Sequence, residues 1–74
     1  MDTRFEAVTD FGKWIKAKDK TVSETAKLLN VSRSYVWMLA TGRAVPRAKM
    51  MAKIQAYTLG AVRAESWMNV ARKL

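Results

Sequence analysis

The residues of this sequence best suited to chemistry are its basic side chains, and the chemistry they suit is the binding of a polyanion. The 74-residue chain carries 14 Lys and Arg against 6 Asp and Glu, a formal net charge of +8. Residues 25–64 contain no acid, and their basic residues are Lys27, Arg33, Arg43, Arg47, Lys49, Lys53 and Arg63. A solubilising surface is the alternative, but such surfaces usually mix both signs of charge. The acid-free stretch therefore favours a surface that faces the phosphates of a nucleic acid.

Catalytic groups are scarce in the same sequence. The chain has no Cys and no His, which removes thiol nucleophiles, imidazole bases and the usual ligands of structural zinc. Asp10, Asp19 and Glu24 are carboxylates that lie near one another in the sequence, and helix capping or surface charge accounts for them. We therefore expect no enzyme, with no catalytic residue, metal site, cofactor or small-molecule substrate.

Signals for secretion or membrane insertion are also missing. Met1-Asp2-Thr3 lacks the basic-then-apolar layout of a secretory signal, and even the longest uncharged runs, such as residues 34–42, are far shorter than a membrane span. We expect a cytoplasmic protein with no membrane partner. A chain of this length forms one small domain, residues 1–74.

Capping residues divide the chain into about five short helices, which predicts an all-α fold, a compact bundle. Thr9 or Asp10 can cap a first helix that runs to about Lys18. The segment Thr21-Val-Ser-Glu24 is a capping box that begins a second helix. That helix should end at Asn30, because Asn tolerates the left-handed backbone of a tight helix exit.

The third predicted helix has an inward face and an outward face. Ser32 can cap it and Gly42 can end it. Its inward positions, three and four residues apart, are Val36, Leu39 and Ala40. Its outward positions are Arg33, Ser34, Trp37, Met38 and Thr41. A merely solvated helix rarely presents both a Trp and a Met to water, so we expect a partner to cover this face.

Two further helices are predicted after Gly42. Pro46 suits the first turn of a fourth helix, which ends near Thr58, and a fifth runs from Ala64 to about Arg72. The capping box Thr3-Arg-Phe-Glu6 could begin the first helix earlier, or residues 4–8 could form a short strand, and spacing alone does not decide between them. A short strand is also an alternative for residues 58–63.

The second and third helices together have the layout of a helix-turn-helix unit, residues 21–42. Ala26 is small where the helices cross, and Val31 and Val36 lie between them. The stretch resembles the helix-turn-helix of the Cro and repressor-type phage regulators. The matching positions are Ala26, Leu29, Val31, Ser32, Val36, Leu39 and Gly42.

Two positions depart from that family pattern. Asn30 replaces the usual Gly of the turn, and Val22 stands where the family commonly has a Gln that holds a phosphate. The resemblance covers roughly residues 10–68 and includes a Thr-x-Gly-x-Val turn, residues 58–62. It implies a Cro-like repressor of phage or prophage origin, a sequence-specific transcriptional regulator that binds a double-stranded DNA operator at the nucleoid of a bacterial cell.

Within this interpretation, helix 33–41 enters the major groove with its N-terminal turns leading. The expected base-reading residues are Arg33, Ser34, Trp37 and Met38. Arg33 is the strongest candidate, because its fork matches guanine O6 and N7, and its alternative role is a phosphate clamp. Trp37 either contacts thymine methyls or lies on a neighbouring helix.

The expected phosphate-binding residues surround this helix and are Lys27, Ser32, Tyr35, Arg43, Arg47 and Lys49. Ser32 also serves as the helix cap, and Tyr35 has half-buried packing as its alternative role. If about six charges each displace a counterion, affinity should fall about 10³-fold or more between about 50 and 200 mM salt.

A homodimer is expected, because one helix-turn-helix reads few base pairs and two copies on a twofold axis read an inverted repeat. Trp67, Met68 and Val70 are its predicted anchors. The alternative for Trp67 is that it seals the core of the monomer.

Two other classes of binding protein fit parts of the pattern. The Trp and Met surface could dock another protein, as in an antitoxin-like or structural adaptor. A basic amphipathic membrane binder fits less well, because the apolar stripes are as narrow as those of a packed bundle.

Overall fold

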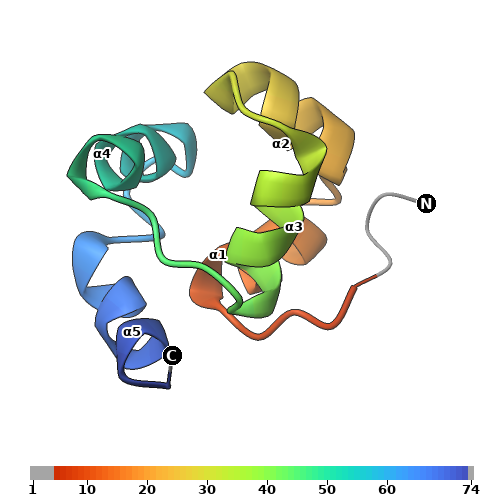
Figure 1. Ribbon diagram of the computed structural model, residues 1–74. Helices are drawn as coiled ribbons and strands as arrows, with labels where there is room; N and C mark the ends of the chain where they lie inside the picture. The colour runs from red at the N-terminus through yellow and green to blue at the C-terminus, as the bar shows by residue number, and fades with distance from the viewer. Residues whose placement is uncertain (1–4, 74) are drawn as a thin grey trace.

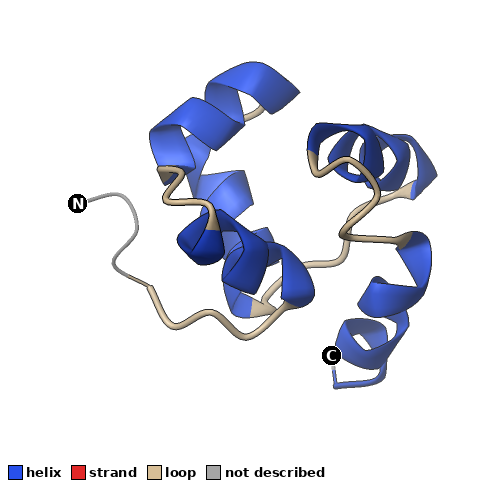
Figure 2. Cartoon of the chain, turned by 180° about the vertical axis from the view of Figure 1, so that it is seen from behind, coloured by secondary structure: helices blue, strands red, loops and turns tan. Residues whose placement is uncertain are grey.

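The protein is built from short helices joined by tight turns, and the computed structural model describes residues 5–73 (Figure 1). The helices are α1 (Asp10–Ala17), α2 (Val22–Leu29), α3 (Arg33–Thr41), α4 (Ala48–Tyr57), the 3₁₀ helix η1 (Ala64–Trp67) and α5 (Met68–Lys73). The described residues contain no strand, which confirms the predicted all-α fold (Figure 2). In both views α2 and α3 lie on one side of the molecule, and α4 and α5 lie on the other.

The first three helices begin where their capping residues predict. The hydroxyl of Thr9 accepts a hydrogen bond from the amide of Gly12 at 3.0 Å, and that of Ser32 accepts from Tyr35 at 3.1 Å. The box that begins at Thr21 is complete, with both of its bonds 3.0 Å long. These bonds satisfy first-turn amides that a helix leaves without acceptors, so local sequence determines the three boundaries.

Left-handed residues end α2 and α3, as the sequence predicts. Asn30 has φ 59° and Gly42 has φ 80°. After Asn30 the amide of Val31 donates to the carbonyl of Ala26 at 2.9 Å, which closes the end of α2. The chain turns sharply there, so α2 and α3 pack directly against each other.

α4 begins later than the position of Pro46 predicts. The N-cap is Arg47, whose backbone is extended and whose side chain makes no capping hydrogen bond, and the helix begins at Ala48. Ala44 and Val45 pack against the core, and Pro46 is itself buried. The chain therefore stays extended through Pro46 to bring these residues inward, and the first helical turn forms after it.

Neither of the two segments for which a strand was an alternative forms one among the described residues. Residue 4 of the first segment lies outside the described residues. Residues 5–8 lead to the end of α3, where the amide of Val8 donates to the carbonyl of Ala40 at 3.2 Å. Residues 58–63 form a turn, because the hydroxyl of Thr58 bonds to the carbonyl one turn earlier at 2.8 Å. Leu59 and Gly60 follow with positive φ and reverse the chain.

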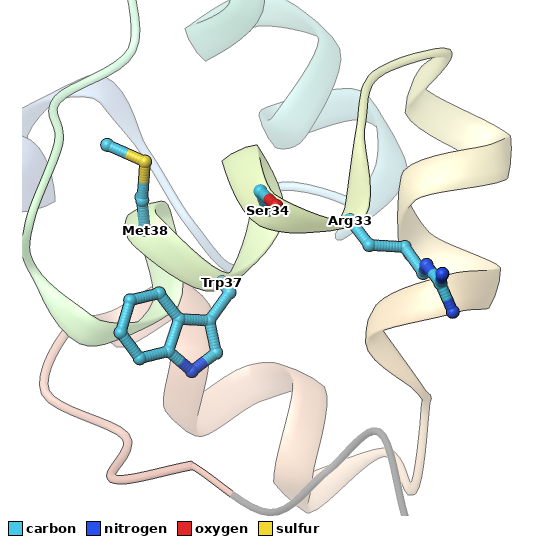
Figure 3. A pocket seen from close by; sticks show the side chains of 4 residues that line it. All are labelled: Arg33, Ser34, Trp37 and Met38. Atoms are coloured by element: carbon cyan, nitrogen blue, oxygen red, sulfur yellow. The ribbon is translucent and has the colours of Figure 1, made fainter.

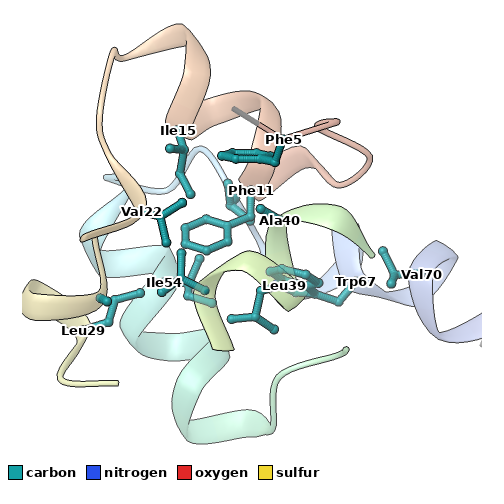
Figure 4. Close-up of a cluster of buried hydrophobic side chains, with 13 residues drawn as sticks. Phe5, Phe11, Ile15, Val22, Leu29, Leu39, Ala40, Ile54, Trp67 and Val70 are labelled. Carbon is teal, nitrogen blue, oxygen red and sulfur yellow. The ribbon is translucent and has the colours of Figure 1, made fainter. Parts of the chain in front are cut away.

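One hydrophobic core joins the helices (Figure 4). The three inward residues of α3 are completely buried, as their spacing predicts. The other fully buried large residues of the described chain include Phe11, Ile15, Ile54, Val62 and Trp67. The ring of Trp67 lies 6.1 Å from that of Phe11, so η1 packs against α1 through an aromatic contact. α3 therefore has a closely packed support behind its outward face.

α1 also holds the C-terminal end of α3. The hydroxyl of Thr9 donates to the carbonyl of Leu39 at 2.8 Å while it caps α1. The two helices meet at Gly12, where a Cβ would collide with the carbonyl oxygen of Ala40. This close approach requires Gly and fixes the position of α3 relative to the bundle.

Candidate nucleic-acid interface

The outward side chains of α3 form one exposed surface. A shallow hollow is lined by Arg33, Ser34, Trp37 and Met38, which we call the α3 face (Figure 3). Trp37 is 39% exposed and Met38 37% exposed, although both side chains are large and mostly apolar. The structure thus brings together the four residues predicted to read bases, and it places them on the surface.

Arg33 lies at the border of two hollows. Its side chain runs from the start of α3 toward α2, whereas Trp37 and Met38 lie farther along α3 (Figure 3). A second hollow beside α2 is lined by Thr21, Ser23, Glu24, Lys27, Leu28 and Arg33. Lys27, predicted to bind phosphate, therefore shares a hollow with Arg33, and the carboxylate of Glu24 in the same hollow accepts a hydrogen bond from the amide of Thr21.

Arg43 lies against Trp37, a contact that the sequence did not predict. The guanidinium carbon is 5.0 Å from the centroid of the Trp37 ring, within the range of a cation–π interaction. Gly42 makes this contact reachable, because its left-handed backbone turns the chain back at the end of α3. Arg43, which the sequence predicted to bind phosphate, is thus in contact with Trp37, which the sequence predicted to read bases.

Ser32 and Tyr35 have clear local roles. Ser32 is exposed and its hydroxyl caps α3. Tyr35 is half-buried and packs against the core, as the alternative interpretation of this residue predicts. Ser32 precedes α3 and Tyr35 lies on its first turn, and a phosphate contact from either remains a prediction beside these structural roles.

Arg47 and Lys49 lie at the start of α4 and are exposed. Neither lines the hollow on the α3 face or the one beside α2. The first turn of α4 contains no acid, and Arg47 provides no side-chain cap. Two cations at the positive end of a helix dipole are unfavourable for the helix itself, and they create a local potential that attracts an anion.

The three predicted dimer anchors differ in exposure. Trp67 is 2% exposed and Val70 is also buried, so these two residues belong to the core of the monomer. Met68 is 58% exposed. Trp67 therefore follows the alternative interpretation, in which it seals the core, and of the three only Met68 presents a large apolar surface.

Leu59 is an exposed apolar residue that the sequence analysis missed. It is 93% exposed and has φ 55°, a conformation that is unfavourable for a leucine. With Ala52, Gln55, Ala56 and Gly60 it lines a hollow at the end of α4. A leucine between Thr58 and Gly60, within a predicted turn, was the signal that could have identified it.

Two further observations concern metal ions and membranes. Within residues 5–73, no three His, Cys, Asp or Glu side chains lie close enough together to hold a metal ion. Over the same part of the chain, each helix is too short or too polar to cross a bilayer.

Comparison of the chain with models of protein families, with curated proteins and with solved structures found no match.

Proposed function

We propose that this protein is a sequence-specific DNA-binding transcriptional regulator, a Cro-like repressor that reads the major groove with α3. The observation that carries the proposal is the α3 face itself: a cation, a hydroxyl and two apolar side chains on the exposed side of a helix that follows a tight turn. These are the groups that bind guanine acceptors and thymine methyls. The packing of α2 against α3 across the turn at Asn30 supports this proposal, because a helix-turn-helix unit has two helices joined in this way.

The charge around the α3 face supports a phosphate-bearing partner. Lys27 lies beside Arg33, Arg43 lies beside Trp37, and Arg47 and Lys49 are exposed at the start of α4. No acid occurs between Thr25 and Ala64, so no carboxylate of this segment repels a phosphate. The partner we propose is therefore a double-stranded DNA operator, with phosphate contacts that set the register and base contacts that select the sequence.

The proposed assembly is a homodimer on an inverted repeat, with an interface that differs from the one predicted from sequence. Trp67 and Val70 are committed to the monomer core, whereas Leu59 and Met68 remain exposed. These two residues lie in the C-terminal part of the chain and outside the α3 face. Self-association through them leaves the α3 face available to DNA.

Selection of bound duplexes from a random pool tests this proposal. We expect enrichment of a short half-site that recurs as an inverted repeat, with centres about 34 Å apart. Affinity for the enriched duplex should fall about 10³-fold or more between about 50 and 200 mM salt. If no sequence is enriched and duplex affinity does not depend on salt concentration, the proposal is contradicted and an adaptor that binds another protein is favoured.

A further inference from the structure

We propose that Trp37 and Arg43 act as one unit that recognises a guanine next to a 5-methylpyrimidine. This inference rests on the proposed function, because it names what the α3 face recognises within a DNA duplex. It assigns base reading to Arg43, whose position outside the recognition helix suggested a phosphate contact only.

The end of α3 holds the two residues together. The amide of Arg43 donates to the carbonyl of Met38 at 2.9 Å, across the left-handed Gly42. The hydroxyl of Thr41 donates to the carbonyl of Trp37 at 2.8 Å. The backbone on both sides of the contact is therefore fixed by hydrogen bonds, and the guanidinium rests 5.0 Å from the centre of the indole ring.

A guanidinium held over an aromatic ring by a cation–π contact keeps N–H groups for hydrogen bonds. Those N–H groups match the paired acceptors O6 and N7 that guanine presents in the major groove. Trp37 also reduces the number of conformations open to Arg43 before binding, so less side-chain entropy is lost when the hydrogen bonds form. Arg43 is thus better prepared for a base contact than a freely solvated arginine.

The apolar part of the same surface suits a methyl group. Trp37 and Met38 line the hollow on the α3 face, and both are more than one-third exposed. In the major groove the apolar group available to them is the C5 methyl of thymine or of 5-methylcytosine. A methyl against Trp37 lies on the same ring that the Arg43 guanidinium contacts, so an adjacent base comes within reach of that guanidinium.

Arg33 also lines the hollow formed by Trp37 and Met38, but its side chain runs toward α2, away from Trp37 (Figure 3). Arg43, in contrast, lies over the Trp37 ring itself. We therefore assign the guanine beside the methyl to Arg43 and a different position of the site to Arg33.

The test begins with the duplex that the wild-type chain selects from a random pool, which we expect to contain a thymine next to a guanine in each half-site. That step is then replaced in turn by uracil–guanine, cytosine–guanine, 5-methylcytosine–guanine and thymine–7-deazaguanine. Loss of the methyl should weaken binding about fourfold. Loss of guanine N7 should weaken it about tenfold.

Variants identify the residues responsible. In Arg43→Lys the penalty for 7-deazaguanine should shrink to less than about threefold, because lysine keeps the charge but loses the fork. Trp37→Leu should shrink the same penalty, because Arg43 loses its support. Arg63→Lys makes the same chemical change at another exposed arginine of the acid-free stretch and should leave the penalty as in the wild type. Circular dichroism confirms that each variant folds.

Each outcome has a defined meaning. Equal binding of the thymine and 5-methylcytosine duplexes supports recognition of the methyl group on either base. Tight binding of the thymine duplex alone supports recognition of the methyl group of thymine. Equal binding of the thymine and uracil duplexes overturns the methyl contact. An unchanged 7-deazaguanine penalty in Arg43→Lys overturns the role of Arg43 and leaves the proposed function standing, whereas failure of the wild type to bind any duplex overturns both.

Discussion

Trp37 and Trp67 are the same type of residue in opposite situations. Trp37 on α3 is 39% exposed and contacts Arg43, whereas Trp67 on η1 is 2% exposed and packs against Phe11. The indole N–H of Trp67 has no hydrogen-bond partner among the described residues. Since burying an unpartnered N–H costs free energy, Trp67 serves the protein through its volume in the core. Trp37 has a large side chain that the core does not use, which indicates a role outside the monomer.

The helices that carry these residues also differ in how they begin. α2 and α3 begin with side-chain caps at Thr21 and Ser32, whereas α4 and η1 begin at Arg47 and Arg63 without one. Local hydrogen bonds therefore fix where α2 and α3 begin, and the outer side of α3 is exposed to solvent. The α4–α5 region depends more on packing against the core.

The largest expected effect separates the two tryptophans. Trp67→Ala removes the largest fully buried side chain of the described residues and should lower the free energy of unfolding by about 3–5 kcal/mol. Trp37→Ala should lower it by less than about 1 kcal/mol, because only an exposed contact is lost. Urea denaturation followed by circular dichroism measures both. Similar losses of unfolding free energy in the two variants would show that Trp37 supports the core as Trp67 does.

Removal of a cap tests the role of local hydrogen bonds in the α2–α3 unit. Thr21→Ala breaks the capping box at the start of α2 and should cost about 1 kcal/mol, since the amide of Glu24 loses its acceptor. The same denaturation experiment detects the change. Stability within experimental error of the wild type would mean that packing alone holds α2.

A substitution at the start of α4 should raise stability and weaken DNA binding at the same time. Arg47→Asp supplies the missing cap and a favourable charge, worth about 1 kcal/mol together. It also reverses the charge of a proposed phosphate contact. Denaturation and duplex titration on the same sample measure the two effects.

Arg63→Asp is the matched control for Arg47→Asp. Arg63 is also an exposed N-cap arginine without a side-chain capping bond, but it precedes η1. We expect Arg63→Asp to weaken duplex binding less than Arg47→Asp does. Equal weakening would mean that net charge, and not the position of Arg47, determines affinity.

The smallest expected effect concerns Asn30 and Leu59, two of the three non-glycine residues of the described chain that have a left-handed backbone, the third being Asp19. Asn30 after α2 and Leu59 after α4 have nearly the same φ, 59° and 55°. Leu59→Asn should raise stability by up to about 1 kcal/mol, because Asn tolerates this backbone better than Leu. If Leu59 lies in the dimer interface, the variant should also dissociate at higher protein concentration in sedimentation experiments. A loss of stability would show that Leu59 is needed within the monomer.

Much of the N-terminal fold could be predicted because its boundaries are local. Thr9, Thr21 and Ser32 form the capping bonds their sequence positions imply, and Asn30 and Gly42 adopt the left-handed exits. The later start of α4 could not be predicted, since it follows from the packing of residues 44–46 into the core. The 3₁₀ geometry of η1 likewise has no side-chain cap to reveal it.

The candidate site was predicted to a similar extent. Helical spacing places Arg33, Ser34, Trp37 and Met38 on one face, because residues three and four apart share a side of a helix. The contact between Trp37 and Arg43 depends on the turn at Gly42 and on side-chain conformation, neither of which follows from spacing. The burial of Trp67 and the exposure of Leu59 depend on which surfaces the bundle covers.

The central claim, that the α3 face meets DNA, is tested most directly by adding one negative charge there and comparing it with the same change elsewhere. Ser34 is exposed in the first turn of α3, where a carboxylate favours the helix, and Ala17 is exposed at the end of α1, outside the α3 face and the proposed dimer surface. Ser34→Glu and Ala17→Glu therefore change the net charge equally, and we expect both variants to fold.

Duplex titration at fixed salt gives the result. We predict that Ser34→Glu weakens binding by about 100-fold or more, because a like charge brought against DNA costs several kcal/mol, while Ala17→Glu changes it by no more than about threefold. Equal losses in the two variants, or a larger loss in Ala17→Glu, would contradict the assignment of DNA binding to the α3 face.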